Sequence, residues 1–136
     1  MHAALTVLGR DTTYASQLDA VGREWFGRRW LGVYAQDTQP PVARDGVGVA
    51  NTGRAPPAGA RVGHWVAYCD SGGRRAFSDP LGTVGRPQRS ELAARFPAAQ
   101  WSDDDPEMAV TGSICGPAAL AACAVGAGSQ ADFLRV

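Results

Sequence analysis

Three residues of types that support nucleophilic catalysis follow one another along the chain: His64, Asp79 and Cys115. In that order they supply a general base, a carboxylate that can orient the base, and a thiol, which are the parts that acyl transfer through a covalent intermediate requires. The other histidine, His2, lies in an N-terminal segment that we expect to be mobile, so histidine-dependent chemistry falls to His64. The pattern therefore predicts a thiol-dependent acyl-transfer site.

Cys115 is the cysteine whose neighbours favour a reactive thiolate. Gly116 and Pro117 follow it, and proline is favoured in the first turn of a helix, so the thiol is predicted at a helix N-terminus. There the helix dipole and free N–H groups stabilise a thiolate, and the Cys115 N–H can hold an oxyanion, while Gly116 allows close approach. The commoner alternative, a small buried core cysteine, fits Cys69 and Cys123.

A predicted β-hairpin brings the base and the carboxylate together. Residues 64–69 alternate with the period of a strand, residues 70–73 read Asp-Ser-Gly-Gly as a turn, and residues 74–78 pair back as the next strand. His64 and Asp79 are then expected at the same end of the sheet. Each has an ordinary explanation by itself, because a lone histidine is more often structural and Asp-Pro often opens a turn. Their order with the thiol favours catalysis.

The other expected elements pack around this hairpin. Trp25–Tyr34 is expected to be an aromatic loop that leads into a strand at 31–34. The remaining predictions are a helix capped by Thr12 or Thr13 and ending near Gly22, a buried strand at 47–52, a helix at 90–96 capped by Ser90, a polar loop at 101–106, and a buried helix from Pro117 to about Val125 that Gly126 and Gly128 terminate.

Length and composition indicate one domain, residues 1–136, with residues 1–11 flexible. The 13 basic residues are all arginine and 13 acidic residues balance them, which argues against strong attraction to nucleic acid or to an anionic membrane. Three scattered cysteines predict neither a disulfide framework nor a metal site, and no cofactor is expected. The short apolar run near the N-terminus cannot span a bilayer. We therefore expect an unsecreted protein in a reducing compartment.

Five short motifs make the chain resemble the adenovirus-type cysteine endopeptidases, the adenain family, whose fold and catalytic order are shared by SUMO-deconjugating proteases. The motifs recur in the family's order and approximate spacing over about residues 12 to 126, and they are residues 30–34, 51–53, 63–67, 79–82 and 115–116. The resemblance implies a papain-like, adenain-like α+β fold with a central mixed or antiparallel sheet flanked by helices.

The same resemblance implies roles for individual residues. His64 would be the general base, Asp79 its orienting carboxylate and Cys115 the nucleophile. The groups expected to bind the oxyanion or the substrate are Gly63, Trp65, Gly116 and Ser113. The sequence does not separate two roles for the Trp65 ring, which could pack the strand or shield the imidazolium. A narrow groove beside the histidine would select a substrate strand with glycine before the cut. The resemblance further implies a viral enzyme that matures structural precursor proteins in the host nucleus or the virion.

The sequence also departs from the family's pattern. The family's oxyanion-hole glutamine lies six or seven residues before the cysteine, where this chain has Met108 and Ala109. The neutral net charge does not support activation by DNA, and no cysteine can be assigned to an activating peptide. Two alternatives therefore stay open: a protease that removes ubiquitin-like proteins, and a protease-fold binding module without turnover.

Overall fold

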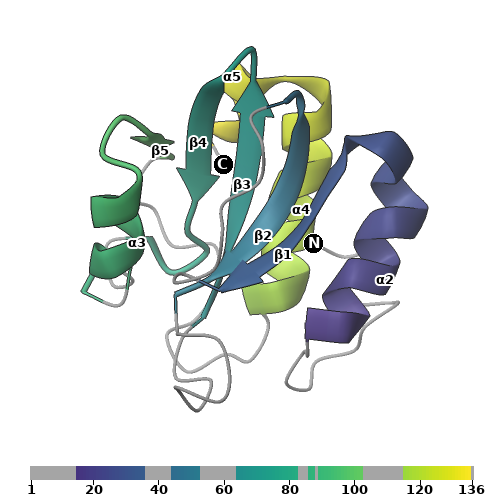
Figure 1. Cartoon of the computed structure of the whole chain (residues 1–136), viewed down its shortest axis with the longest axis horizontal. Helices are drawn as coiled ribbons and strands as arrows, with labels where there is room; N and C mark the ends of the chain where they lie inside the picture. The colour runs from purple at the N-terminus through teal and green to yellow at the C-terminus, as the bar shows by residue number, and fades with distance from the viewer. Residues whose placement is uncertain are drawn as a thin grey trace.

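The computed structural model describes residues 15–35, 44–52, 64–82, 86–87, 89–102 and 115–135. Within these ranges the chain has an α+β fold, with one mixed five-stranded sheet in the order β1-β2-β3-β4-β5 and helices packed against it (Figure 1). The elements are α2 (Ala15–Phe26), the 3₁₀ turn η1 (Gly27–Arg29), β1 (Trp30–Ala35), β2 (Gly46–Asn51), β3 (Trp65–Ser71), β4 (Arg74–Ser78), α3 (Ser90–Arg95), β5 (Gln100–Trp101), α4 (Cys115–Gly128) and α5 (Gln130–Phe133).

The register of the strands gathers several strand ends at one edge of the sheet. β1 and β2 are parallel, β3 is antiparallel to both β2 and β4, and β5 is parallel to β4. Asn51, the last residue of β2, is opposite Trp65, the first of β3, and Ser78, the last of β4, is opposite Ala67. The chain therefore leaves β2 and β4 at the same edge at which it enters β3.

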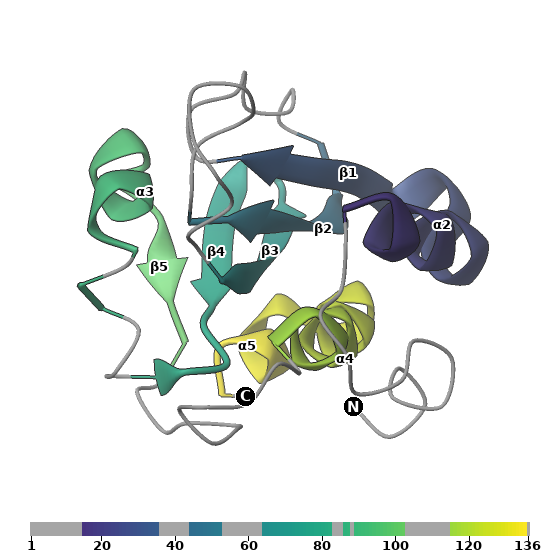
Figure 2. The same cartoon turned by 90° about the horizontal axis from the view of Figure 1, so that it is seen from below.

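Strand β3 is buried on both faces of the sheet. Trp65, Ala67 and Cys69 belong to the core that α2, α4 and α5 cover, whereas Val66 and Tyr68 belong to a second core that α3 covers. Figure 2 shows α4 and α5 below the sheet and α3 at the left, next to the edge strand β5. The predicted alternation of β3 is confirmed, as are the strands expected around Leu31, Val47 and Arg74.

Two glycines expected to terminate helices lie inside them instead. Helix α2 continues through Gly22 to Phe26. Glycine is needed at position 22 because a Cβ there would lie 2.2 Å from Cε2 of Trp30. Helix α4 continues through Gly126 to Gly128, and a Cβ at position 126 would lie 2.8 Å from a ring carbon of Phe133. Both glycines admit an aromatic ring against the helix, so the end predicted near Gly22 and the stop at Gly126 were wrong for reasons of packing. Helix α4 does end at Gly128, the other predicted terminator.

Two further predictions differ from the structure. Helix α3 begins at Ser90, but the residue in the N-cap position is Arg89, and the Ser90 hydroxyl donates to the carbonyl of Pro87 instead (3.1 Å). Trp101 is not in a loop, because it pairs with β4 as part of β5 and stacks on Phe77 with the ring centroids 4.8 Å apart. Helix α5 was not expected. The Thr12 or Thr13 cap and residues 103–106 lie outside the described residues.

Candidate active site

His64 and Asp79 are in direct contact, as the hairpin predicted. Nε2 of His64 lies 2.9 Å from Oδ1 of Asp79, and the two side chains are only 7% and 1% exposed. His64 immediately precedes β3 and Asp79 immediately follows β4, so the antiparallel register places the pair at the edge described above. The expected proximity is therefore confirmed for two of the three predicted catalytic side chains.

The turn after β4 shapes the carboxylate's surroundings. The carbonyl of Asp79 accepts the N–H of Gly82 (2.9 Å), and Gly82 has a φ of 57°, which glycine adopts without strain. The side chain of Asp79 also accepts the N–H of Leu81 at Oδ1 (2.9 Å). Asp79 therefore serves both as a turn residue and as the partner of His64, so the turn role of Asp-Pro is compatible with the predicted role of Asp79 beside the histidine.

The charge state of Asp79 fixes the roles of the two ring nitrogens of His64. Burial alone would raise the pKa of the Asp79 carboxyl, but the hydrogen bond and charge of His64, reinforced by donors from Arg89 and Leu81, hold that pKa below its usual value. An ionised carboxylate only accepts hydrogen bonds, so Nε2 of His64 carries the proton of the contact. Proton exchange with a nucleophile would then use Nδ1.

The backbone of His64 is held by Thr52, the residue that follows β2. The N–H of His64 donates to the Thr52 hydroxyl (3.0 Å), and the N–H of Thr52 donates to the carbonyl of His64 (3.0 Å). Beside them, the hydroxyl of Ser102 donates to that of Ser78 (3.1 Å), which ties the segment after β5 to the end of β4. Short polar side chains thus connect the strand ends around the pair.

Arg89 is a charged partner of the pair that sequence reasoning missed. Its Nη1 lies 2.9 Å from Oδ2 of Asp79 and 3.1 Å from the carbonyl oxygen of Gly82, and the residue is only 7% exposed. No local pattern marks an arginine before a short helix as a buried ion-pair partner. The only available signal was general, since a buried carboxylate needs donors at both oxygens.

Helix α4 begins at Cys115, two residues before the expected start at Pro117, so Cys115 is at a helix N-terminus as predicted. The helix runs beside β3 in the same direction (Figure 1). The Cys123 thiol donates to the carbonyl of Gly48 (3.1 Å), and Gly48 is opposite Tyr68 in the sheet. From residue 123 back to 115 the helix spans about 12 Å, and from residue 68 back to 64 the strand spans about 13 Å. The first turn of α4 is therefore level with His64.

The structure describes three of the remaining residues near the candidate site, which are Trp65, Gly116 and Pro117. Gly116 and Pro117 are buried in the first turn of α4. Trp65 is 6% exposed and belongs to the α4 side of the core, so its side chain packs the strand, which was one of its two expected roles. The side chain of Cys115, together with the residues Gly63 and Ser113 and the positions 103–114 that hold Met108 and Ala109, lies outside the described residues.

Cys69 and Cys123 are free, buried thiols, as expected. Burial raises the pKa of the Cys69 thiol to about 11 and raises that of Cys123 further above its ordinary value. Their hydrogen bonds run to backbone carbonyls, with Cys69 donating to that of Gly126 at 3.7 Å. Both thiols are therefore poor nucleophiles at neutral pH.

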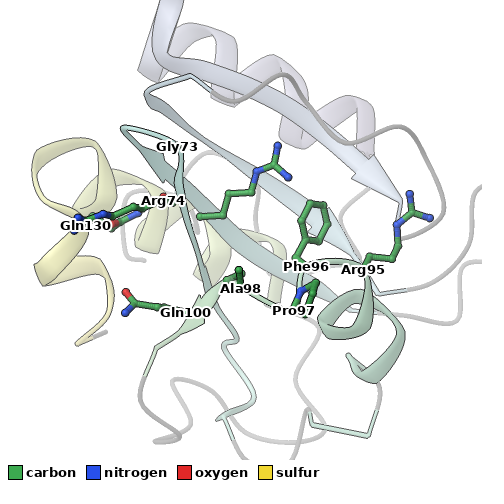
Figure 3. Close-up of a pocket in the computed structure, with 10 residues that line it drawn as sticks. Gly73, Arg74, Arg95, Phe96, Pro97, Ala98, Gln100 and Gln130 are labelled. Atoms are coloured by element: carbon green, nitrogen blue, oxygen red, sulfur yellow. The ribbon is translucent and has the colours of Figure 1, made fainter.

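A cavity of about 620 Å³ lies at the other end of β4 (Figure 3). Its lining residues are Gly73, Arg74, Arg75, Arg95, Phe96, Pro97, Ala98, Ala99, Gln100 and Gln130. The strand separates Arg75 from Asp79 by about 13 Å. Among the residues that the structure describes, none of the predicted site residues lines this cavity.

The described residues contain neither a group of metal ligands nor a membrane-spanning helix, and the chain matches no known family. Among the residues that the structure describes, no three His, Cys, Asp or Glu side chains are grouped as metal ligands, and no helix is long and apolar enough to cross a membrane. No family model and no curated protein matches the chain. Residue chemistry and geometry therefore carry the functional inference.

Proposed function

We propose that the chain is a cysteine endopeptidase with Cys115 as nucleophile, His64 as general base and Asp79 as the orienting carboxylate. One observation carries the proposal: a buried His64–Asp79 pair lies at the end of the sheet that is level with the first turn of α4, where Cys115 begins the helix. A base held by a carboxylate beside a thiol at a helix N-terminus is the arrangement that thiol-dependent acyl transfer requires.

The reaction follows from the roles of these groups. Nδ1 of His64 takes the proton of the Cys115 thiol, and the resulting thiolate adds to the carbonyl carbon of the scissile peptide bond. The Cys115 N–H stabilises the oxyanion of the tetrahedral intermediate. The imidazolium then gives its proton to the departing amine, leaving an acyl-enzyme that water hydrolyses with His64 again as base.

The oxyanion needs more than one donor. Pro117 has no N–H, so the first turn of α4 offers fewer donors than an ordinary helix start. A second donor is expected from the segment between Trp101 and Ser113, either from a backbone N–H or from the hydroxyl of Thr111 or Ser113. Gly112 would let that segment approach the thiol.

The substrate is proposed to be an extended segment of a structural precursor protein with glycine before the scissile bond. This specificity comes from the resemblance of residues 30–34, 51–53, 63–67, 79–82 and 115–116 to the adenain family, as do the papain-like fold assignment and a viral origin with action in the host nucleus or the virion. Removal of ubiquitin-like proteins would use the same chemistry on a different substrate.

A binding module without turnover is the second candidate. It is favoured by Met108 and Ala109, which occupy the positions at which the resembled family has its oxyanion-hole glutamine. Loss of one oxyanion donor costs about 10²–10³ in rate, which would leave binding without efficient hydrolysis unless another donor replaces it.

Hydrolysis of peptides with glycine before the cut tests the proposal. The native chain should cleave them, Cys115→Ala should abolish cleavage, and Cys69→Ser should retain it as a matched control at a buried thiol. Cleavage that survives Cys115→Ala in pure protein would contradict the assignment. If the native chain binds these peptides without cleaving them, the binding module is the better account.

A further inference from the structure

Arg89 is a buried cation with two hydrogen bonds to the turn that carries Asp79. Its side chain is 9% exposed, and one terminal nitrogen contacts both Oδ2 of Asp79 (2.9 Å) and the carbonyl of Gly82 (3.1 Å). Arginine is rarely buried without a compensating partner. The fold therefore encloses this cation together with the carboxylate instead of leaving it to solvent.

The guanidinium is fixed by stacking as well as by hydrogen bonds. Its central carbon lies 4.5 Å from the centroid of the Trp101 ring, and that ring stacks on Phe77 of β4. Arg89 itself precedes α3, whereas Trp101 belongs to β5. The start of α3 and strand β5, which both lie outside the hairpin, thus hold the Arg89 guanidinium against the end of β4.

The two oxygens of Asp79 have different partners. Oδ1 faces Nε2 of His64 and the Leu81 N–H, whereas Oδ2 faces Arg89. Rotation of the carboxylate about its Cβ–Cγ bond would break contacts on both sides at once. Arg89 at Oδ2 therefore restricts the orientation in which Oδ1 meets His64.

The charges of the group also balance. With neutral His64, the carboxylate and the guanidinium sum to zero, and transfer of a proton from Cys115 to His64 leaves the sum at zero. Without the guanidinium, the carboxylate, the imidazolium and the thiolate would together carry one net negative charge, which is costly in low-dielectric surroundings. Burial raises the pKa of Asp79, whereas among the described residues the contacts with His64, Arg89 and the Leu81 N–H lower that pKa.

We propose that Arg89 is a positioning residue of the site: it holds the Asp79 carboxylate so that Oδ1 meets Nε2 of His64, and its charge keeps the net charge of the group at zero when the Cys115 thiolate forms. The second half rests on the proposed peptidase function. The first half concerns only the His64–Asp79 contact and can be tested without any catalysis.

The first experiment follows the hydrogen-bonded His64 Nε2 proton by NMR in Cys115→Ala protein, with Arg89 intact or changed to Met or Lys. With Arg89 intact, the signal should persist as the pH is lowered from 7 to 5. Arg89→Met should lose it at a higher pH, because removing a donor raises the pKa of Asp79, and Arg89→Lys should restore it in part. Arg74→Met, at the exposed start of β4, is the matched control.

The second experiment measures alkylation of Cys115 by iodoacetamide in protein that retains Cys115, with Arg89 intact or changed to Met or Lys. Arg89→Met should slow it at least about tenfold near neutral pH, with partial rescue by Arg89→Lys. A folded Arg89→Met protein that keeps the His64 proton signal over the same pH range would overturn the positioning role. If Arg89→Met does not fold, Arg89→Gln takes its place, and an unchanged signal there is equally contradictory.

These two readouts separate the two proposals. If Cys115 of the native chain reacts like an ordinary thiol, the peptidase proposal fails, while the NMR experiment still decides whether Arg89 positions Asp79. If Cys115 is reactive and Arg89→Met changes neither readout, only the Arg89 proposal fails.

Discussion

Replacing Asp79 with asparagine should disturb one side of the carboxylate more than the other. An asparagine oxygen in the place of Oδ1 can still accept from His64 and from the Leu81 N–H. The amide nitrogen then takes the place of Oδ2 and presents a donor to the Arg89 guanidinium, which is itself only a donor. The substitution therefore leaves a buried cation facing another donor.

The size of this effect follows from burial. The Asp79 side chain is 1% exposed and that of Arg89 is 9% exposed, so solvent screens the pair little. Removing one partner of a buried ion pair costs about 3–5 kcal/mol in the free energy of unfolding. We expect Asp79→Asn to fall in this range at pH 7, whereas Asp79→Asn combined with Arg89→Met should cost less than the sum of the two single changes.

The loss of unfolding free energy caused by Asp79→Asn should become smaller as the pH is lowered. The pKa of Asp79 is lower in the folded protein than its ordinary value of about 3.9, so the native carboxylate binds its proton less readily than the unfolded one. Its contribution to stability is complete above the unfolded pKa and is lost as the pH falls through the folded one. The difference between native chain and Asp79→Asn should therefore narrow below about pH 4.

Urea denaturation at a series of pH values measures both effects, with Asp19→Asn as the matched control. Asp19 also accepts from an arginine (Arg23, 2.7 Å) and from an indole (Trp30, 2.8 Å), but its side chain is 32% exposed. The control should cost about 1 kcal/mol or less. A loss at Asp79 no larger than that at Asp19, or one that does not change with pH, would refute this account of the buried pair.

Two further predictions concern packing and the core thiols. Gly22→Ala should lower the free energy of unfolding, measured by heat or urea, by about 1–3 kcal/mol because the added Cβ meets the Trp30 ring. The control Gly128→Ala should be neutral or slightly stabilising, because nothing lies within 4 Å of a Cβ at that position. Equal effects of the two changes would refute the packing role of Gly22. Cys123→Ser should lower the free energy of unfolding by about 1–3 kcal/mol and leave peptide cleavage unchanged, and a loss of cleavage in folded protein would assign this buried thiol a part in the reaction.

The hairpin and its contact could be predicted because they are local. The alternation of residues 64–69, the turn signal at 70–73 and the return strand predict an antiparallel pair, and the pair brings His64 and Asp79 to one edge of the sheet. Within the predicted turn, Asp70 and Ser71 extend β3, so only Gly72 and Gly73 form the turn. The start of α4 was equally readable, since Pro117 marks a first helical turn.

Contacts between distant elements could not be predicted from sequence. Arg89 reaches Asp79 only because α3 and β5 fold back over the end of β4, and no periodicity encodes that placement. Gly22 resembles a helix terminator in sequence, yet its role depends on the position of Trp30. Trp65 remained ambiguous because β3 is buried on both faces, so alternation did not distinguish a core face from a substrate face.

Alkylation kinetics of the three cysteines test the central claim most directly. Native protein is treated with iodoacetamide between pH 6 and 8, and mass spectrometry assigns the modified residue. We predict rapid modification of Cys115 at a rate that is nearly independent of pH and is reduced in His64→Gln, because His64 would keep the thiol ionised. Cys69 should not react, because with a pKa of about 11 less than about one-thousandth of it is thiolate at pH 7. A Cys115 rate that rises about tenfold per pH unit and is unchanged in His64→Gln would contradict the Cys115–His64–Asp79 site.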